Sequence, residues 1–111
     1  MEEDKVILFY VPTSSVDEAK KIAKELLEKR LCACVNIYPE VYSLYWWEDK
    51  LEEGTEAVMI IKTRKSLADE VEETISSLHT YTCPSIIRLG EITEANKCFI
   101  DWILRETKPA K

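Results

Sequence analysis

Two cysteines separated by a single residue are the first side chains in this sequence that could carry chemistry. Cys32 and Cys34 flank Ala33, and residues two apart on an extended strand point to the same face. Two thiolates at that spacing could share a soft ion such as copper(I) or zinc. Free cysteine is also among the residue types most often buried, so a role as a small apolar core residue is the alternative. The four cysteines form no C-x-x-C pair, which disfavours a structural zinc site.

The only histidine, His79, begins the segment His-Thr-Tyr-Thr-Cys-Pro between an expected helix and an expected strand. His79 and Cys83 could both ligate a metal ion. A histidine at a helix C-terminus can instead interact with the terminal carbonyls. With one histidine, nucleophilic catalysis would have to pair His79 with Cys34 or Cys83, and no Ser-His-Asp or Cys-His-Asn arrangement is evident. We therefore expect a binding protein rather than an enzyme, with no required cofactor.

Charged residues gather in two further places. Glu56 and Lys62 share one parity of an expected strand, and residues 62–65 (KTRK) are the only basic cluster. This cluster could bind an anion, or it could be a solvated strand end before a helix. The acidic stretch over 48–53 could attract divalent cations weakly, although a charged hairpin tip is more often solvated.

Composition excludes several classes of protein. There are 15 basic and 21 acidic residues, and the formal net charge is -6, which disfavours binding to nucleic-acid phosphates. Only two glycines occur, so glycine-rich phosphate loops are excluded. The acidic residues 2–4 and the short apolar run over 6–11 fit neither a secretory signal nor a membrane span. We expect a cytoplasmic protein without a membrane partner, in which the cysteines are reduced thiols.

The spacing of apolar residues along the chain predicts the helices and strands that position these side chains. The 111 residues fit one domain, 1–111, because domains run to about 100–200 residues. Ser15 and Glu18 form a capping box before an amphipathic pattern, and Ser66 with Asp69 is expected to cap a second helix. The predicted order is βαββαβ plus a C-terminal helix, an α+β, ferredoxin-like split βαβ sandwich. The strands are predicted over 5–11, 32–47, 55–63 and 85–92, and the helices over 15–30, 66–78 and from Thr93 onward.

The strand predicted over 32–47 is too long for its own domain. At about 3.3 Å per residue it would run on the order of 50 Å, whereas a domain of this size has a radius of gyration of about 13 Å. Either Pro39 bends the strand or the hairpin tip protrudes. Exposed apolar surface on such a tip would favour aggregation of a monomer, so we expect a homo-oligomer. The tip residues in question are Tyr42, Leu44, Tyr45, Trp46 and Trp47.

Several short motifs follow one another in an order that is specific to one family. They are Leu31-Cys32-Ala33-Cys34-Val35-Asn36-Ile37, Ser43-Leu44-Tyr45-Trp46-Trp47, Glu56, Ile60-Ile61-Lys62-Thr63, His79 with Tyr81 and Pro84, and Phe99-x-x-Trp102-Ile103. This succession spans nearly the whole chain and resembles the CutA family of divalent-cation tolerance proteins.

The resemblance implies a ferredoxin-like, P-II-like homotrimer in the cytoplasm, linked to tolerance of copper and other divalent cations. It implies an inter-subunit cleft for a metal ion or a small molecule. The residues carried over to that cleft are Cys34, Tyr45, Trp47, Glu56, Lys62 and His79. The expected metal ligands are His79, Cys34 and Cys32, with copper(I) at the thiols and copper(II) bound weakly through the imidazole.

The sequence departs from the family pattern at several positions. Thr80 and Ser85 stand where members commonly have a proline and an acid. Phe9 and Leu78 stand where some members have a thiol and a second histidine, so two potential copper ligands are absent. Asp49 replaces the usual turn glycine, for which a longer or differently shaped turn is expected. A P-II-like small-molecule sensor or interaction trimer without a metal function is therefore the alternative to a metal-binding tolerance protein.

Overall fold

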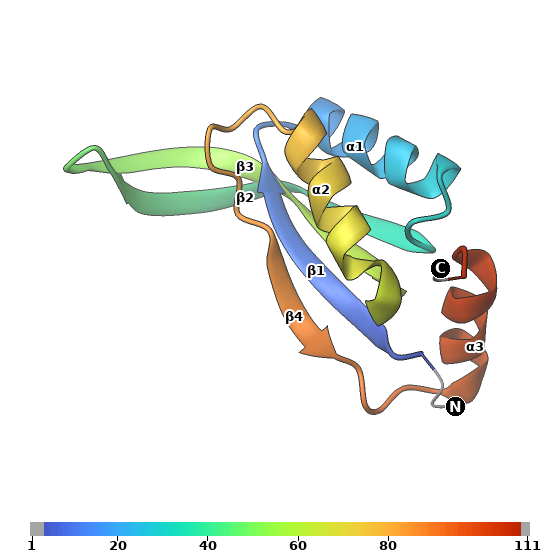
Figure 1. Ribbon diagram of the computed structural model, residues 1–111. Helices are drawn as coiled ribbons and strands as arrows, with labels where there is room; N and C mark the ends of the chain where they lie inside the picture. The colour runs from blue at the N-terminus through green and yellow to red at the C-terminus, as the bar shows by residue number, and fades with distance from the viewer. Residues whose placement is uncertain (1–3, 110–111) are drawn as a thin grey trace.

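A four-stranded antiparallel sheet with the strand order β2-β3-β1-β4 forms the frame of the computed structural model, which describes residues 4–109 (Figure 1). This order and the two helices after β1 and β3 confirm the predicted α+β, ferredoxin-like arrangement. The elements are β1 (Val6–Thr13), α1 (Val16–Glu28), β2 (Cys34–Trp47), β3 (Lys50–Arg64), a 3-10 turn (Lys65–Leu67), α2 (Ala68–Leu78), β4 (Ile87–Glu91) and α3 (Lys97–Glu106).

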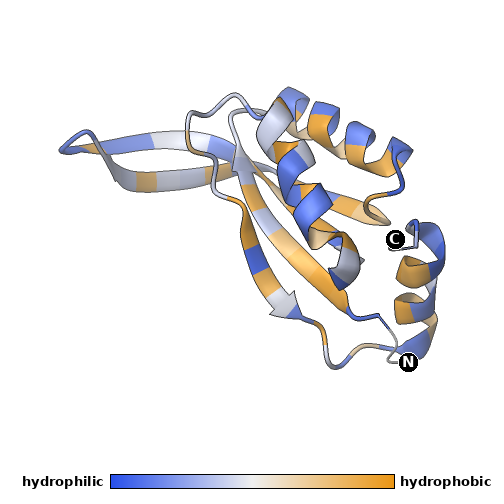
Figure 2. Ribbon diagram, viewed as in Figure 1, coloured by the Kyte–Doolittle hydropathy of each residue, from blue (hydrophilic) through white to orange (hydrophobic). Residues whose placement is uncertain are grey.

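The two faces of the sheet differ because only one of them is covered by α1 and α2. Alternate residues of β3, namely Ala57, Met59 and Ile61, are buried on that face, as the period of two predicts. They pack with Phe9 of β1 and with the apolar stripes of both helices in one core. Figure 2 shows β1 as hydrophobic over most of its length, which fits its central place in the sheet.

The β2–β3 hairpin extends well beyond the helices (Figure 1), so the molecule measures 49 × 26 × 22 Å. The radius of gyration, 14.8 Å, exceeds the value of about 13 Å for a compact chain of this length. Pro39 also interrupts the strand, because the register with β3 shifts between Tyr38 and Val41 and proline cannot donate a ladder hydrogen bond. The hairpin tip therefore protrudes, and Pro39 also disrupts the regular pairing of the long strand.

The hairpin turn is shorter than expected. Trp47 pairs with Lys50, so the turn consists of Glu48 and Asp49 alone, with φ values of 49° and 64°. Two positive φ values are typical of the type I′ turn, which matches the twist of the strands. Of the two alternatives for Asp49, the longer turn is therefore wrong, and β3 begins at Lys50 rather than at residue 55, because backbone pairing continues through the charged tip.

The start of α1 confirms half of the predicted capping box. The Ser15 hydroxyl accepts a hydrogen bond from the Glu18 backbone N–H at 3.1 Å. The Glu18 carboxylate, however, accepts from the backbone N–H of Ser14 at 2.8 Å and not from that of Ser15. The helix ends at Glu28, before the predicted Arg30, because Arg30 adopts the left-handed conformation with φ 58° that terminates helices.

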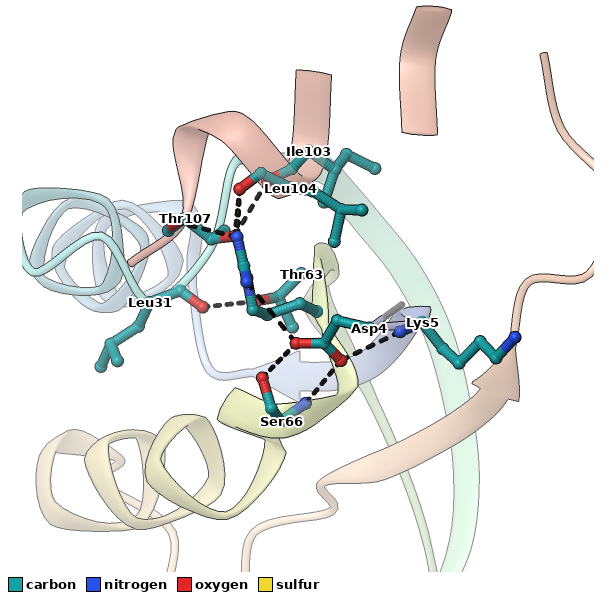
Figure 3. A network of polar contacts seen from close by, with 9 residues as sticks. Asp4, Lys5, Leu31, Thr63, Ser66, Ile103, Leu104 and Thr107 are labelled. Atoms are coloured by element: carbon teal, nitrogen blue, oxygen red, sulfur yellow. Dashed lines mark hydrogen bonds and ion pairs between the residues drawn. The ribbon is translucent and has the colours of Figure 1, made fainter. Parts of the chain in front are cut away.

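The predicted Ser66–Asp69 cap of the second helix is wrong. Leu67 precedes α2 without a side-chain cap, and the Ser66 hydroxyl donates to Asp4 instead. Arg64, two residues before Ser66, ties Asp4 to the C-terminus of α3: its Nε donates to the Thr107 hydroxyl at 2.8 Å, and its Nη2 donates to the carbonyls of Leu104 and Thr107. Figure 3 shows Asp4, Leu104 and Thr107 in this network. Arg64 therefore holds α3 against the end of the sheet.

The last two elements are shorter than predicted. The strand expected over 85–92 is Ile87–Glu91, an exposed edge strand. The helix expected from Thr93 begins at Lys97, because Asn96 has the extended conformation of an N-cap residue. Within residues 4–109, no helix is long and apolar enough to cross a membrane.

Candidate functional site

The six residues carried over to one cleft lie in three separate regions of a single chain. Glu56 and Lys62 are six residues apart on β3, which corresponds to about 20 Å along a strand. His79 lies near Glu56, and Cys34 pairs with Lys62 in the register of β2 and β3. Tyr45 and Trp47 belong to the protruding hairpin. One chain alone does not bring the six side chains together.

His79 is buried and both of its ring nitrogens have partners. Its side chain is 0% exposed. The Nε2 atom lies 2.8 Å from the Pro12 carbonyl oxygen, which can only accept, so Nε2 donates. The Nδ1 atom accepts from the Tyr81 backbone N–H at 3.1 Å. A metal ion could bind His79 only after one of these hydrogen bonds broke.

Glu18 is a residue of this region that the sequence reading did not place in the site. Its carboxylate accepts from the backbone N–H and hydroxyl of Ser14, and from the backbone N–H of Thr80 at 2.7 Å. Burial alone would raise the pKa of Glu18, but the hydrogen bonds from Thr80 and Ser14 outweigh it and lower the pKa from 4.5 to about 2. The capping box flagged Glu18 as a helix residue, but no local signal revealed its bond to Thr80.

Tyr81 links this region to Glu56. The Tyr81 hydroxyl donates to the Glu56 carboxylate at 2.8 Å, and its ring centroid lies 4.6 Å from that of His79. Burial, the hydrogen bond to Glu56 and the nearby carboxylates raise the pKa of Tyr81, so the phenol keeps its proton. Tyr45 contributes to the same shift and so lies within electrostatic range. We call Glu18, Glu56, His79 and Tyr81 the His79 cluster.

Only one of the two thiols at 32 and 34 lies on a strand, so the prediction that both lie on one strand face was wrong. β2 begins at Cys34, and Cys32 lies before it in the hydrophobic core with 1% exposure. Burial, together with the nearby Cys34, raises the pKa of the Cys32 thiol to about 12, which disfavours the thiolate that a metal needs. Cys34 is half-buried, and its thiol lies 3.8 Å from the Asn36 Oδ1 atom.

The three residues expected to bind a metal therefore form no ligand set within one chain. His79 has both nitrogens occupied by hydrogen bonds, and Cys32 is buried as a protonated thiol. Cys83, the other candidate near His79, is exposed. Among residues 4–109, no group of three or more His, Cys, Asp and Glu side chains could hold a metal ion.

A cleft lies at the base of β2 and β3, on the sheet face opposite α1 and α2. Its volume is about 430 Å³. The Lys62 Nζ atom is 5.3 Å from the centroid of the Phe99 ring of α3, a distance at which an ammonium interacts with an aromatic face. Sequence reasoning selected Lys62 but missed this contact. We call this the Lys62 cleft, and it is lined by Asn36, Ile37, Tyr38, Ile60 and Lys62.

The rest of the basic cluster over 62–65 is neutralised by carboxylates. Arg64 pairs with Asp4, and Lys65 pairs with Glu91. A second cavity beside them, of about 440 Å³, is lined by side chains of both signs, Asp4, Lys65, Asp69 and Arg88 among them. The anion-binding potential predicted for this cluster is therefore concentrated at Lys62.

Residues 7–106 match the family described as CutA1 divalent ion tolerance protein. The divalent-cation tolerance protein CutA of Archaeoglobus fulgidus is 47% identical over 94 residues, which cover 85% of this chain and 90% of that protein. The crystal structure of CutA1 from Oryza sativa has a TM-score of 0.91 at 35% identity and covers 96% of each chain.

The solved structure of the Archaeoglobus fulgidus protein, described as periplasmic, has a TM-score of 0.89 at 42% identity, covering 93% of this chain and 99% of that one. The match in sequence extends from β1 to the end of α3, and the match in structure covers the same fold. This chain therefore belongs to the CutA1 divalent ion tolerance protein family, which supports a general function in divalent-cation tolerance.

Proposed function

We propose that this protein acts in divalent-cation tolerance as a homotrimer whose inter-subunit clefts bind a metal ion or a small ligand. The observation that carries the proposal is the exposure of large apolar side chains on the β2–β3 hairpin. Tyr42 is 77% exposed, Trp46 73% and Trp47 50%. Contiguous apolar surface of this kind marks an interaction site.

The sheet edges support the same assembly. β2 and β4 are the two outer strands, so each leaves one row of backbone groups without a partner strand in the sheet of residues 4–109. Leu89 and Ile87 on β4 are also exposed. Free edges with apolar side chains readily pair with another chain, and a second and third copy of this protein are the partners that the family resemblance implies.

The assembly also offers a way to complete the cleft. Trp47 lies at the end of β2 beside the hairpin turn, whereas His79 and the Lys62 cleft lie on the body of the same chain. A hairpin that reaches onto a neighbour would place its aromatic side chains beside a body that is not its own. We propose that the six residues meet only between subunits.

For metal ions, the geometry favours a thiol over the imidazole. Cys34 is half-buried and makes only a long contact to Asn36, whereas His79 has two good hydrogen bonds to lose. We propose that copper(I), which prefers thiolates, binds near Cys34 and that copper(II) binds weakly. Lys62, which has no carboxylate partner among residues 4–109, favours the second candidate function, a P-II-like sensor of a small molecule.

We further propose a binding rather than a catalytic role, and a cytoplasmic location with no nucleic-acid or membrane partner. The location rests on the four free thiols. The Archaeoglobus fulgidus relative is described as periplasmic, so cell fractionation with an antibody to this chain is the measurement that decides. Recovery in the periplasmic fraction would contradict the proposal.

Light scattering tests the assembly. We expect a mass three times the chain mass of 12.9 kDa, and a mass of one chain at micromolar concentration would refute the homotrimer.

Copper titrations test the metal ligands. His79→Gln should weaken copper(II) binding and leave copper(I) binding unchanged, while Cys34→Ser should do the reverse. If wild-type protein binds neither ion more tightly than an unrelated acidic protein does, the metal function fails and the sensor function remains.

A further inference from the structure

Among residues 4–109, Lys62 has no carboxylate within 4.0 Å, although the protein has a surplus of acidic residues. Within residues 4–109, the other basic side chains without a carboxylate within 4.0 Å are all exposed, whereas Lys62 is half-buried. A partly buried ammonium that is not paired loses hydration without gaining an ion pair. It contacts the Phe99 ring, and no side chain or backbone acceptor among residues 4–109 accepts a hydrogen bond from its ammonium group.

The surroundings of Lys62 supply the other features of a ligand site. In the β2–β3 register Cys34 pairs with Lys62 and Asn36 pairs with Ile60, so Asn36 is the diagonal neighbour of Lys62 on the same face. The Asn36 Oδ1 atom accepts from the Cys34 thiol, which leaves the amide N–H₂ as a donor. Flat or apolar walls come from Tyr38 and Ile60.

The cleft has the size and composition of a small-molecule site. Its volume of about 430 Å³ falls within the range of about 300–1,000 Å³ for ligand pockets, which combine apolar walls with a few polar groups. Its lining carries one positive charge and no negative charge. The ammonium and the amide supply one hydrogen-bond donor for each of the two oxygens of a carboxylate. A phosphate carries a higher negative charge than this single ammonium matches.

We infer that the Lys62 cleft binds a small organic carboxylate whose charged end contacts Lys62 and Asn36 and whose flat apolar part lies against Tyr38 and Ile60. The inference rests on the proposed function, because it names the ligand class for one part of the inter-subunit cleft. It does not depend on a metal ion, because the charged end of the ligand contacts Lys62 and Asn36 directly.

Calorimetry with benzoate and its neutral analogue benzamide tests the inference on the whole wild-type protein. Benzoate should bind, and benzamide should bind about tenfold more weakly or worse, since a charge-assisted hydrogen bond is lost. Lys62→Met should weaken benzoate binding by a similar factor. Lys62→Arg, which keeps the charge, should retain benzoate binding, and Lys50→Met, which removes an exposed lysine at the start of β3, is the matched control.

Three outcomes would overturn the inference: no benzoate binding at millimolar concentration, equal binding of benzoate and benzamide, or equal benzoate affinity of wild type and Lys62→Met. The first two comparisons use wild-type protein, so they stand even if Lys62→Met does not fold. Tighter binding of phenyl phosphate than of benzoate would overturn the choice of a carboxylate.

Light scattering and copper titration on the same samples separate this failure from that of the proposed function. A trimer that binds copper but not benzoate contradicts the inference alone. A monomer that binds benzoate through Lys62 supports the inference and contradicts the trimer.

Discussion

The base and the tip of the β2–β3 hairpin both carry large apolar side chains but have very different surroundings. At the base, Met59 and Ile61 are fully buried beneath α1 and α2. At the tip, Leu51 is 61% exposed and Trp46 73% exposed, although the same two strands continue with paired backbones. The comparison teaches that backbone pairing forms these strands, whereas burial depends on what covers them.

The largest effect is expected in the covered half. Phe9 of β1 is fully buried and pairs with Ile61, so Phe9→Ala should lower the free energy of unfolding by about 3–5 kcal/mol. Urea unfolding measures it. The matched tip variant Leu51→Ala should lose much less, and its loss should depend on protein concentration because it acts through assembly. Equal, concentration-independent losses would show that both halves are covered within one chain.

The uncovered half should control assembly instead. Replacing both Trp46 and Trp47 by Ala should cost about 2 kcal/mol or more of association free energy per tryptophan, because buried aromatic side chains dominate interfaces. Light scattering should then report a mass below that of wild type, with an unchanged circular dichroism spectrum. Glu48→Ala, in the adjacent turn, is the control. An unchanged mass in the double variant would show that the hairpin is not the contact.

Glu18 extends the comparison, because it stabilises the covered part of the molecule by hydrogen bonds rather than by packing. Glu18→Gln removes the charge that accepts bonds from Ser14 and Thr80, and should cost about 2 kcal/mol at pH 7. Since folding lowers the pKa from 4.5 to about 2, the stabilisation is present above pH 4.5 and is lost as the pH falls toward 2.

Urea unfolding of both proteins across that pH range measures the effect. Wild type and Glu18→Gln should converge as the pH falls toward 2. Glu28→Gln, at an exposed position at the other end of α1, should show no such convergence. A difference between wild type and Glu18→Gln that does not change with pH would contradict the role of the charge.

The smallest effect is expected at the turn of the uncovered half. Glu48 and Asp49 both have positive φ, a conformation that Asn and Gly adopt at lower cost. Replacing Glu48 by Asn and Asp49 by Gly should raise the free energy of unfolding by about 0.5–1 kcal/mol. Thermal unfolding would detect it as a higher midpoint, and a lower midpoint would show that the acidic side chains stabilise the tip.

The sequence predicted the fold well because most of its signals are local. The period of two in β3 and the helical spacing in α1 each depend on neighbouring residues, and the structure confirms both. The length of β2 also predicted a protruding hairpin, since a strand of fixed rise cannot shorten. The element ends were less accurate, because Ser66 and Glu18 bond to partners outside their own helices.

The sequence by itself determined the chemistry available to this protein: one imidazole, four thiols, a surplus of carboxylates and an aromatic hairpin. Only the tertiary structure decided which of these groups are free to act. Cys32 is buried, and both ring nitrogens of His79 form hydrogen bonds with the backbone of Pro12 and Tyr81. Lys62 is half-buried and has no carboxylate partner in the part of the chain that the structure describes. Hydrogen bonds and ion pairs join residues far apart in the chain, so a side chain's freedom to bind depends on partners that spacing along the sequence does not reveal.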